Sequence, residues 1–147
     1  MSAPALTEAE LAALGATVLT DIPDAVIYAD RDGTMRFWNP GAERIFGFTR
    51  EEALGQSLDL IIPERLRKRH WDGYAHMMQT GQSRYAADKL LSVPAQTKDG
   101  NTLSIQFTVA PVRGSDGALA GIVAVLRDAT ATFNELKRLR AQVSGRI

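Results

Sequence analysis

The sequence predicts an α+β fold in a single domain, and three observations support this prediction. The chain has 147 residues, which is the size of one domain. Its apolar content of 45% and its charged content of 23% are those of an ordinary globular protein. Helical and strand patterns follow one another without an internal repeat: a helix, a hairpin, a group of short helices, three strands and a last helix.

The first third of the chain contains the hairpin and its flanking helices. Pro23 ends the first helical pattern, because a proline restricts the residue before it. An Asp-Gly dipeptide between two β-type runs is typical of a hairpin turn. Asn39 and Thr49 are good N-cap residues, and each precedes a short apolar helical pattern. The expected elements are a helix within residues 1–20, strands over 25–29 and 34–38, and short helices after 39 and 49.

The rest of the chain combines one long helix with β-rich sequence. Pro94 predicts that its strand lies at an edge of the sheet, since proline lacks the N–H that a central strand needs. Residues 102–112 alternate between apolar and polar, as a half-buried strand does. The expected elements are a compact segment over 57–62, a helix over 64–80, strands over 88–95, 102–112 and 119–127, and a helix after 130.

Composition excludes several classes of function. The chain has no cysteine, which removes disulfides, thiolate metal sites and thiol nucleophiles. Its formal net charge is zero, so we expect no nucleic-acid partner. The longest apolar run, residues 118–126, is about half of a bilayer-spanning helix, and no export signal is visible, so we expect a cytoplasmic protein and no membrane partner. No phosphate loop or nucleophile motif is present, and we expect no enzymatic activity.

Several motifs in this order resemble the PAS domain, a sensor module. They are the Asp-Gly hairpin, the segment 38–48 (WNPGAERIFGF), the segment 51–55 (EEALG), the turn 98–100 (KDG), and the segment 127–130 (RDAT) before a helix. The resemblance implies a five-stranded antiparallel sheet with helices on one face. It divides the chain into a flanking helix (1–20), a sensor domain (21–130) and a signalling helix (131–147).

The helix expected over residues 64–80 carries both histidines of the chain. At a period of 3.6 residues, His70 lies on the apolar face with Leu66, Tyr74 and Met77, whereas His76 lies on the charged face. A histidine on an apolar face often packs in the core with a backbone partner for its ring nitrogen. Periodicity alone therefore leaves open whether His70 is a core residue or a ligand.

The segment from Ile62 to His70 resembles the start of this helix in the haem-binding PAS domains of FixL-type kinases and of the oxygen-sensing phosphodiesterase. The resemblance implies haem b as cofactor, His70 as the ligand of its iron, and a diatomic gas (O2, CO or NO) or redox state as the signal. A neutral imidazole is a common axial ligand of haem. The expected pocket residues are Ile62, Leu66, Tyr74 and Met77 near the helix, and Leu91, Ile105, Phe107, Val109 and Val123 on the strands.

Those domains also place an arginine or a methionine beside the bound gas, on the following strand. Residues 84–91 correspond to that strand, and Arg84, Asp88 and Lys89 do not match its pattern. The sequence therefore leaves the sixth ligand and the identity of the gas open. A cofactor-free PAS interaction module and a PAS pocket for a small organic ligand remain alternatives.

The last helix is expected to carry the signal to an effector protein. Leu136, Leu139 and Val143 follow the 3,4 spacing of a coiled-coil seam, although a helix packed on its own sheet has the same pattern. Apolar residues in the first helix, with Phe133 near the start of the last one, predict a homodimer. The effector is expected on a partner or elsewhere in a longer chain.

Overall fold

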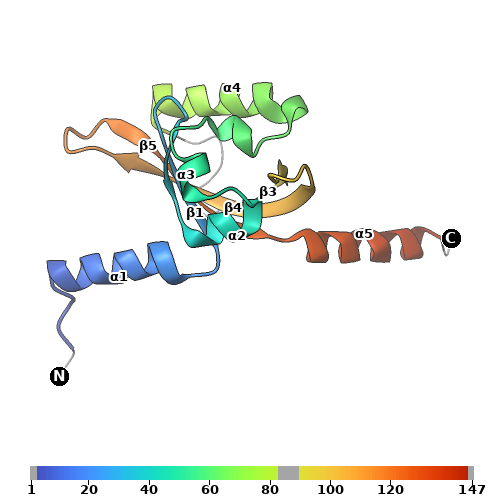
Figure 1. Ribbon diagram of the computed structural model, residues 1–147, viewed down its shortest axis with the longest axis horizontal. Coiled ribbons are helices and arrows are strands. Elements are labelled where there is room, and N and C mark those ends of the chain that lie inside the picture. Colours follow the sequence, from blue (N-terminus) through green and yellow to red (C-terminus); the bar gives the residue numbers. More distant parts are fainter. Residues whose placement is uncertain (1–2, 83–89, 146–147) are drawn as a thin grey trace.

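A five-stranded antiparallel sheet is the centre of the computed structural model, which describes residues 3–82 and 90–145 (Figure 1). The strand order is β2-β1-β5-β4-β3. The strands are β1 Ala25–Asp30, β2 Met35–Trp38, β3 Leu91–Gln96, β4 Thr102–Arg113 and β5 Leu119–Asp128. The helices are α1 Glu8–Asp21, α2 Pro40–Phe46, α3 Arg50–Ala53, the 3-10 turn η1 Leu58–Leu60, α4 Glu64–Thr80 and α5 Thr130–Ser144.

This architecture confirms the predicted α+β fold and its antiparallel sheet. The strand containing Pro94 is β3, which lies at an edge of the sheet as its proline predicts. The predicted strand over residues 88–95 is described only from residue 91, and residues 88 and 89 lie outside the described part of the chain. The other predicted strands and helices agree with the structure to within a few residues.

One face of the sheet, which we call the inner face, packs against α2, α3 and η1. Registers place Ala25 opposite Leu126 and Ile27 opposite Ala124, and these side chains share the inner face because paired residues of an antiparallel sheet point the same way. The core on this face is apolar. It contains Ala25, Ile27, Met35, Trp38, Ala42, Phe46, Ala53, Ile61, Ala95, Ile105 and Leu126.

Asn39 joins four segments beneath this core and begins α2 as its N-cap. Its side-chain oxygen accepts from the backbone N–H groups of Val26 (2.8 Å) and Ala42 (2.9 Å). Its amide group donates to the carbonyls of Leu19 (2.9 Å) and Asp24 (3.0 Å). The side chain is 1% exposed, and these four bonds satisfy its hydrogen-bonding capacity.

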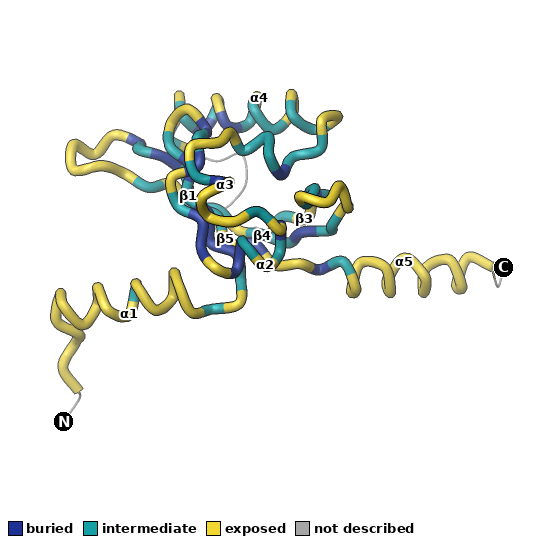
Figure 2. The backbone as a smooth tube through the Cα atoms, viewed as in Figure 1, coloured by how far each residue is buried: buried dark blue, intermediate teal, exposed yellow. Residues whose placement is uncertain are grey.

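The two terminal helices extend beyond the sheet in opposite directions along the longest dimension of the molecule (Figure 1). Neither α1 nor α5 contains a buried residue, and Figure 2 shows both as almost entirely exposed. A Thr7–Glu10 capping box begins α1. None of the helices in residues 3–82 and 90–145 is long and apolar enough to cross a membrane.

Candidate functional site

Helix α4 carries the residues on which the sequence-based site depends. It begins after Pro63 and ends at Gly81, whose positive φ of 71° closes the helix in the left-handed region. Tyr74 and Met77 are buried, and Leu66 and His70 are half-buried, so the predicted apolar face is the less exposed one. His76 is also half-buried, although its position on the charged face predicts exposure.

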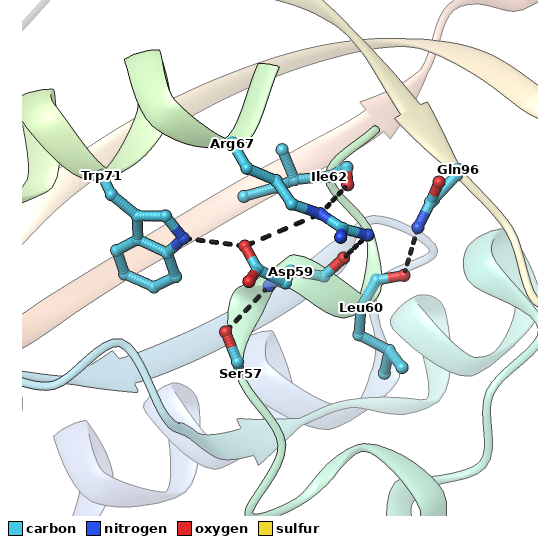
Figure 3. Close-up of polar contacts among 7 residues, drawn as sticks. All are labelled: Ser57, Asp59, Leu60, Ile62, Arg67, Trp71 and Gln96. Carbon is cyan, nitrogen blue, oxygen red and sulfur yellow. Dashed lines mark hydrogen bonds and ion pairs between the residues drawn. The ribbon is translucent and has the colours of Figure 1, made fainter. Parts of the chain in front are cut away.

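Polar contacts fix α4 to the turn η1 (Figure 3). The indole Nε1 of Trp71 donates to Asp59 Oδ1 at 2.7 Å. The guanidinium of Arg67 donates from Nε to the carbonyl of Ile62 (3.0 Å) and from Nη2 to the carbonyl of Asp59 (3.3 Å). Gln96 of β3 donates to another η1 carbonyl at 3.3 Å, which links the edge of the sheet to the same turn. The bonds of Arg67 and Trp71 hold α4 against η1 and the segment that follows it.

The C-terminal half of α4 packs on the turn of the β1–β2 hairpin. The hydroxyl of Tyr74 donates to the backbone carbonyl of Asp30. The ring of Trp71 lies against Gly33, where a Cβ atom would be only 2.1 Å from Trp71 Cη2. Burial raises the pKa of the Tyr74 hydroxyl, and the nearby Asp30 carboxylate raises it further, so this group stays protonated and acts as a donor. A recess of about 350 Å³ borders Trp71 and Tyr74 on this side.

His70 lies on α4 between Arg67 and Tyr74 and takes part in none of these hydrogen bonds. Its Nδ1 atom is buried and is the one such side-chain nitrogen or oxygen without a hydrogen-bond partner in the part of the chain that the structure describes. The ring contacts aromatic neighbours, with centroid distances of 4.7 Å to Trp71 and 5.8 Å to Tyr74. Burial lowers the pKa of the imidazole, and the charge of Asp59 opposes this effect.

This environment gives His70 the properties of a metal ligand. A lowered pKa keeps the imidazole neutral near pH 7, which leaves a nitrogen lone pair free for coordination. A buried ring nitrogen without a partner is costly unless something else engages the ring. Among the described residues, no three His, Asp or Glu side chains form a cluster for a metal ion. A haem iron needs only one protein ligand on each side, so His70 fits such a group and does not need a cluster.

The structure places four of the five predicted strand residues on one face of the sheet. Leu91, Ile105, Phe107 and Val109 share the inner face, since the registers pair Leu91 with Phe107 and Val109 with Ala124. Ile105 is completely buried in the core, and Ile62 and Phe107 pack against that core. Leu91 and Val109 are half-buried.

Val123 does not belong with the other strand residues. It pairs with Tyr28 and Ala110, and these partners alternate with the inner-face residues, so Val123 points away from α4. The expectation that Val123 lines a pocket beside His70 is therefore wrong. Residues 119–127 are apolar almost throughout, so the sequence does not show which side chains of this strand point inward; the register does.

Asp59, Arg67 and Trp71 are absent from the residues predicted as a site, although they position α4. Arg67 and Trp71 are four residues apart and therefore lie on one side of the helix, which the spacing alone could have shown. Nothing in the sequence pairs them with Asp59, which lies in a different element. The predicted mismatch at Arg84, Asp88 and Lys89 lies outside the described residues.

Comparison with known proteins agrees with this fold. The chain is 28% identical over 128 residues to the sensor protein FixL of Bradyrhizobium diazoefficiens, covering 86% of this chain and 25% of FixL. It is 29% identical over 138 residues to the oxygen sensor protein DosP of Escherichia coli, covering 92% of this chain and 17% of DosP. The chain therefore spans a quarter or less of these relatives.

Solved structures show the same fold at lower identity. The PAS domain of a Colwellia psychrerythraea protein has a TM-score of 0.71 at 20% identity, covering 82% of this chain and 98% of that domain. The PAS domain of the Cronobacter turicensis quorum-sensing receptor RpfR, solved with C12:0, has a TM-score of 0.61 at 16% identity, with coverage of 75% and 97%. The family model described as PAS fold matches residues 19–132, and the chain therefore belongs to the PAS fold family.

Proposed function

We propose that this PAS domain is a haem-based sensor of a diatomic gas or of redox state, with His70 as the protein ligand of the iron. The observation that carries the proposal is the buried, unpartnered Nδ1 of a histidine whose pKa burial has lowered. The resemblance of the segment from Ile62 to His70 to haem-binding PAS domains supports it. The similarity to FixL and to the oxygen sensor DosP points to the same class of signal.

The other residues of the proposed site have supporting roles. Leu66 and Met77, from α4, and Leu91, Phe107 and Val109, from the inner face, would supply apolar contact for the porphyrin. Tyr74 would border the site while its hydroxyl remains bonded to Asp30. When bound, haem b would supply an iron atom at which a diatomic ligand binds.

A matched pair of histidine variants tests this proposal. The protein is titrated with hemin, and the Soret band is followed in the wild type, His70→Ala and His76→Ala. Both variants remove an imidazole from α4, but only His70 is expected to coordinate. We expect a one-to-one complex whose Soret band is lost in His70→Ala and retained in His76→Ala. For His70→Gly, added imidazole should restore the band, because the free ring can occupy the same place.

Two results would contradict the haem proposal. The proposal would end if titration of the wild-type protein with hemin gave no saturable one-to-one change in the Soret band. An unchanged Soret band in His70→Ala would remove His70 from it. Carbon monoxide added to the reduced complex should shift the band, and this shift tests whether a gas can reach the iron.

A small organic ligand is the second candidate, and one observation favours it. Inner-face side chains such as Val93, which is 41% exposed, offer apolar surface that an acyl chain could cover as well as a porphyrin could. The RpfR structure with C12:0 shows this class of ligand on a related fold. Binding of dodecanoic acid that survives in His70→Ala, together with no hemin uptake, would favour this function over haem.

We also propose that the protein acts as a cytoplasmic homodimer that passes its signal to an effector through α5. Exposed apolar residues on both terminal helices support the dimer. A change in packing between α4 and the sheet would alter the equilibrium between two arrangements of α5. Sedimentation equilibrium of the wild type tests the dimer, and a monomer at high micromolar concentration would refute it.

A further inference from the structure

The imidazole of His70 lacks the hydrogen bond that normally orients a metal-binding histidine. Such a histidine bonds its second ring nitrogen to a carboxylate, a carbonyl or a water molecule, and this bond fixes the orientation of the ring. The Nδ1 atom of His70 is buried and has no partner among the described residues. The contacts of the ring in this part of the chain are with its aromatic neighbours, and these contacts are what can orient it.

Trp71 is the aromatic neighbour with the closer contact to this imidazole. The centroids of the two rings are 4.7 Å apart, and the rings meet edge to face at an angle of 77°. Tyr74 lies farther from His70, with a centroid distance of 5.8 Å. Gly33 bounds the indole on another side, because a Cβ atom there would be 2.1 Å from Trp71 Cη2. The position of the indole therefore limits how the imidazole can turn.

Asp59 holds the indole of Trp71 in this position. Its Oδ1 atom accepts a hydrogen bond from Trp71 Nε1 at 2.7 Å, a short distance that is typical of a charged acceptor (Figure 3). Asp59 is itself fixed within η1. Its backbone N–H donates to Ser57 Oγ at 3.1 Å, and its carbonyl accepts from Arg67 Nη2 at 3.3 Å. A fixed carboxylate thus acts on His70 through Trp71.

The carboxylate of Asp59 also acts on the imidazole through its charge. Both groups contact the indole of Trp71, so a single ring separates them. The charge of Asp59 raises the pKa of His70, against the larger effect of burial. Arg67 Nε lies 3.8 Å from Asp59 Oδ1 and offsets part of this charge. A nearby carboxylate favours the ferric state of an iron bound at His70, because ferric iron carries one more positive charge than ferrous iron.

We propose that Asp59 is the positioning residue of the His70 site: it orients the imidazole through Trp71, and its charge favours the oxidised state of a bound iron. The inference rests on the proposed haem function and adds a residue from outside α4 to that site. Two variants separate the two parts of this role. Asp59→Asn keeps an oxygen that accepts a hydrogen bond but removes the charge, whereas Asp59→Ala removes both.

The hydrogen bond is tested by NMR on the isotope-labelled protein without haem. The indole N–H of each of the two tryptophans gives one signal. Trp38 is the internal control, because its Nε1 donates to the carbonyl of Phe48 at 3.0 Å and not to Asp59. In Asp59→Ala, we expect the indole N–H of Trp71 to exchange with water at least ~10-fold faster and that of Trp38 to stay within ~3-fold. Asp59→Asn should restore most of the protection.

The effect on the imidazole is read from the ring proton signals of the two histidines in the same samples. The measurement is made at pH 8, where a histidine with an ordinary or lowered pKa is neutral. In Asp59→Ala, the His70 signal should shift as the neighbouring indole moves, and the signal of His76, on another face of α4, should not. An unchanged Trp71 exchange rate or an unchanged His70 signal in Asp59→Ala would overturn the proposal.

The charge is tested by the reduction potential of the hemin complex. We expect the potential to be more positive in Asp59→Asn than in the wild type, because the carboxylate no longer favours ferric iron. Asp72→Asn is the matched control. It removes the same charge from an exposed residue of α4 that pairs with Lys68 at 3.0 Å, and it should leave the potential unchanged. An unchanged potential in Asp59→Asn, or an equal shift in Asp72→Asn, would overturn the proposal.

These results are distinct from a failure of the haem proposal. A wild-type protein that binds no hemin would refute the proposed function and, with it, the effect of Asp59 on a bound iron. A one-to-one hemin complex whose potential does not change in Asp59→Asn would refute only the role of Asp59. Circular dichroism checks that each variant folds.

Discussion

Asn39 and His70 are both polar residues inside the same domain, but their surroundings differ completely. Asn39 makes four hydrogen bonds and ties β1, α1 and α2 together, whereas the Nδ1 of His70 has no partner among the described residues. Most buried polar groups in folded proteins are satisfied, and exceptions often mark a functional site. We call the fully hydrogen-bonded side around Asn39, formed by β1, α1 and α2, the frame; on the α4 side, a buried polar atom has no partner among the described residues.

The packing of the two sides shows the same contrast. In the core on the inner face, the side chains of Met35, Trp38 and Phe46 are almost completely inaccessible. Along α4, only two of 17 residues are buried, and the helix is held mainly by hydrogen bonds from Arg67, Trp71 and Tyr74. Regions with few buried apolar contacts open most easily. We therefore expect α4 to open more readily than the frame around Asn39.

The largest expected effect comes from Asn39→Ala, which breaks the frame. The variant leaves the N–H groups of Val26 and Ala42 without their acceptor and removes the N-cap of α2. We expect the free energy of unfolding to fall by about 3 kcal/mol or more, measured by urea denaturation. Asn101→Ala, at an exposed turn, is the control and should cost about 0.5 kcal/mol. Similar losses in the two variants would contradict the special role of Asn39.

Gly33→Ala tests the contact that holds α4 to the hairpin. Gly33 has a φ of 79°, and the added methyl group must displace the Trp71 ring. Gly117→Ala is a matched control, because Gly117 has the same φ but no atom within 4 Å of its Cβ position. We expect Gly33→Ala to cost about 1 to 3 kcal/mol more than the control and to shift tryptophan fluorescence to longer wavelength. Equal costs and unchanged fluorescence would mean that Trp71 does not anchor α4.

The frame could be predicted from the sequence and the α4 side only in part, for physical reasons. N-caps such as Asn39, turn glycines and the edge position of Pro94 depend on local backbone chemistry, which short segments specify. The His70 face of α4 follows from helical period. The Trp71–Asp59 bond and the orientation of Val123 depend on tertiary placement and strand register, which no local pattern contains. The prediction was wrong at Val123 for this reason.

Tyr74→Phe should have the smallest effect at neutral pH and sharpens the comparison through its pH dependence. Loss of the hydroxyl bond to Asp30 should cost about 1 kcal/mol. Burial raises the pKa of Tyr74 in the folded protein, so above the unfolded value of about 10 the unfolded chain loses its proton first. Wild-type stability should then fall by up to about 1.4 kcal/mol per pH unit, through this residue, as the pH rises.

Urea denaturation between pH 8 and 11 measures this difference. Tyr74→Phe should lack the part of the alkaline decline that the buried hydroxyl causes, and the two curves should converge as the pH rises. Tyr28→Phe, on the outer face, should keep the decline. Parallel curves for the wild type and Tyr74→Phe would mean that the hydroxyl is not held in a buried, protonated state. The hydroxyl of Tyr74 would then lack a fixed partner, as the Nδ1 of His70 does, and the hydrogen bonds that hold α4 would be limited to those of Arg67 and Trp71.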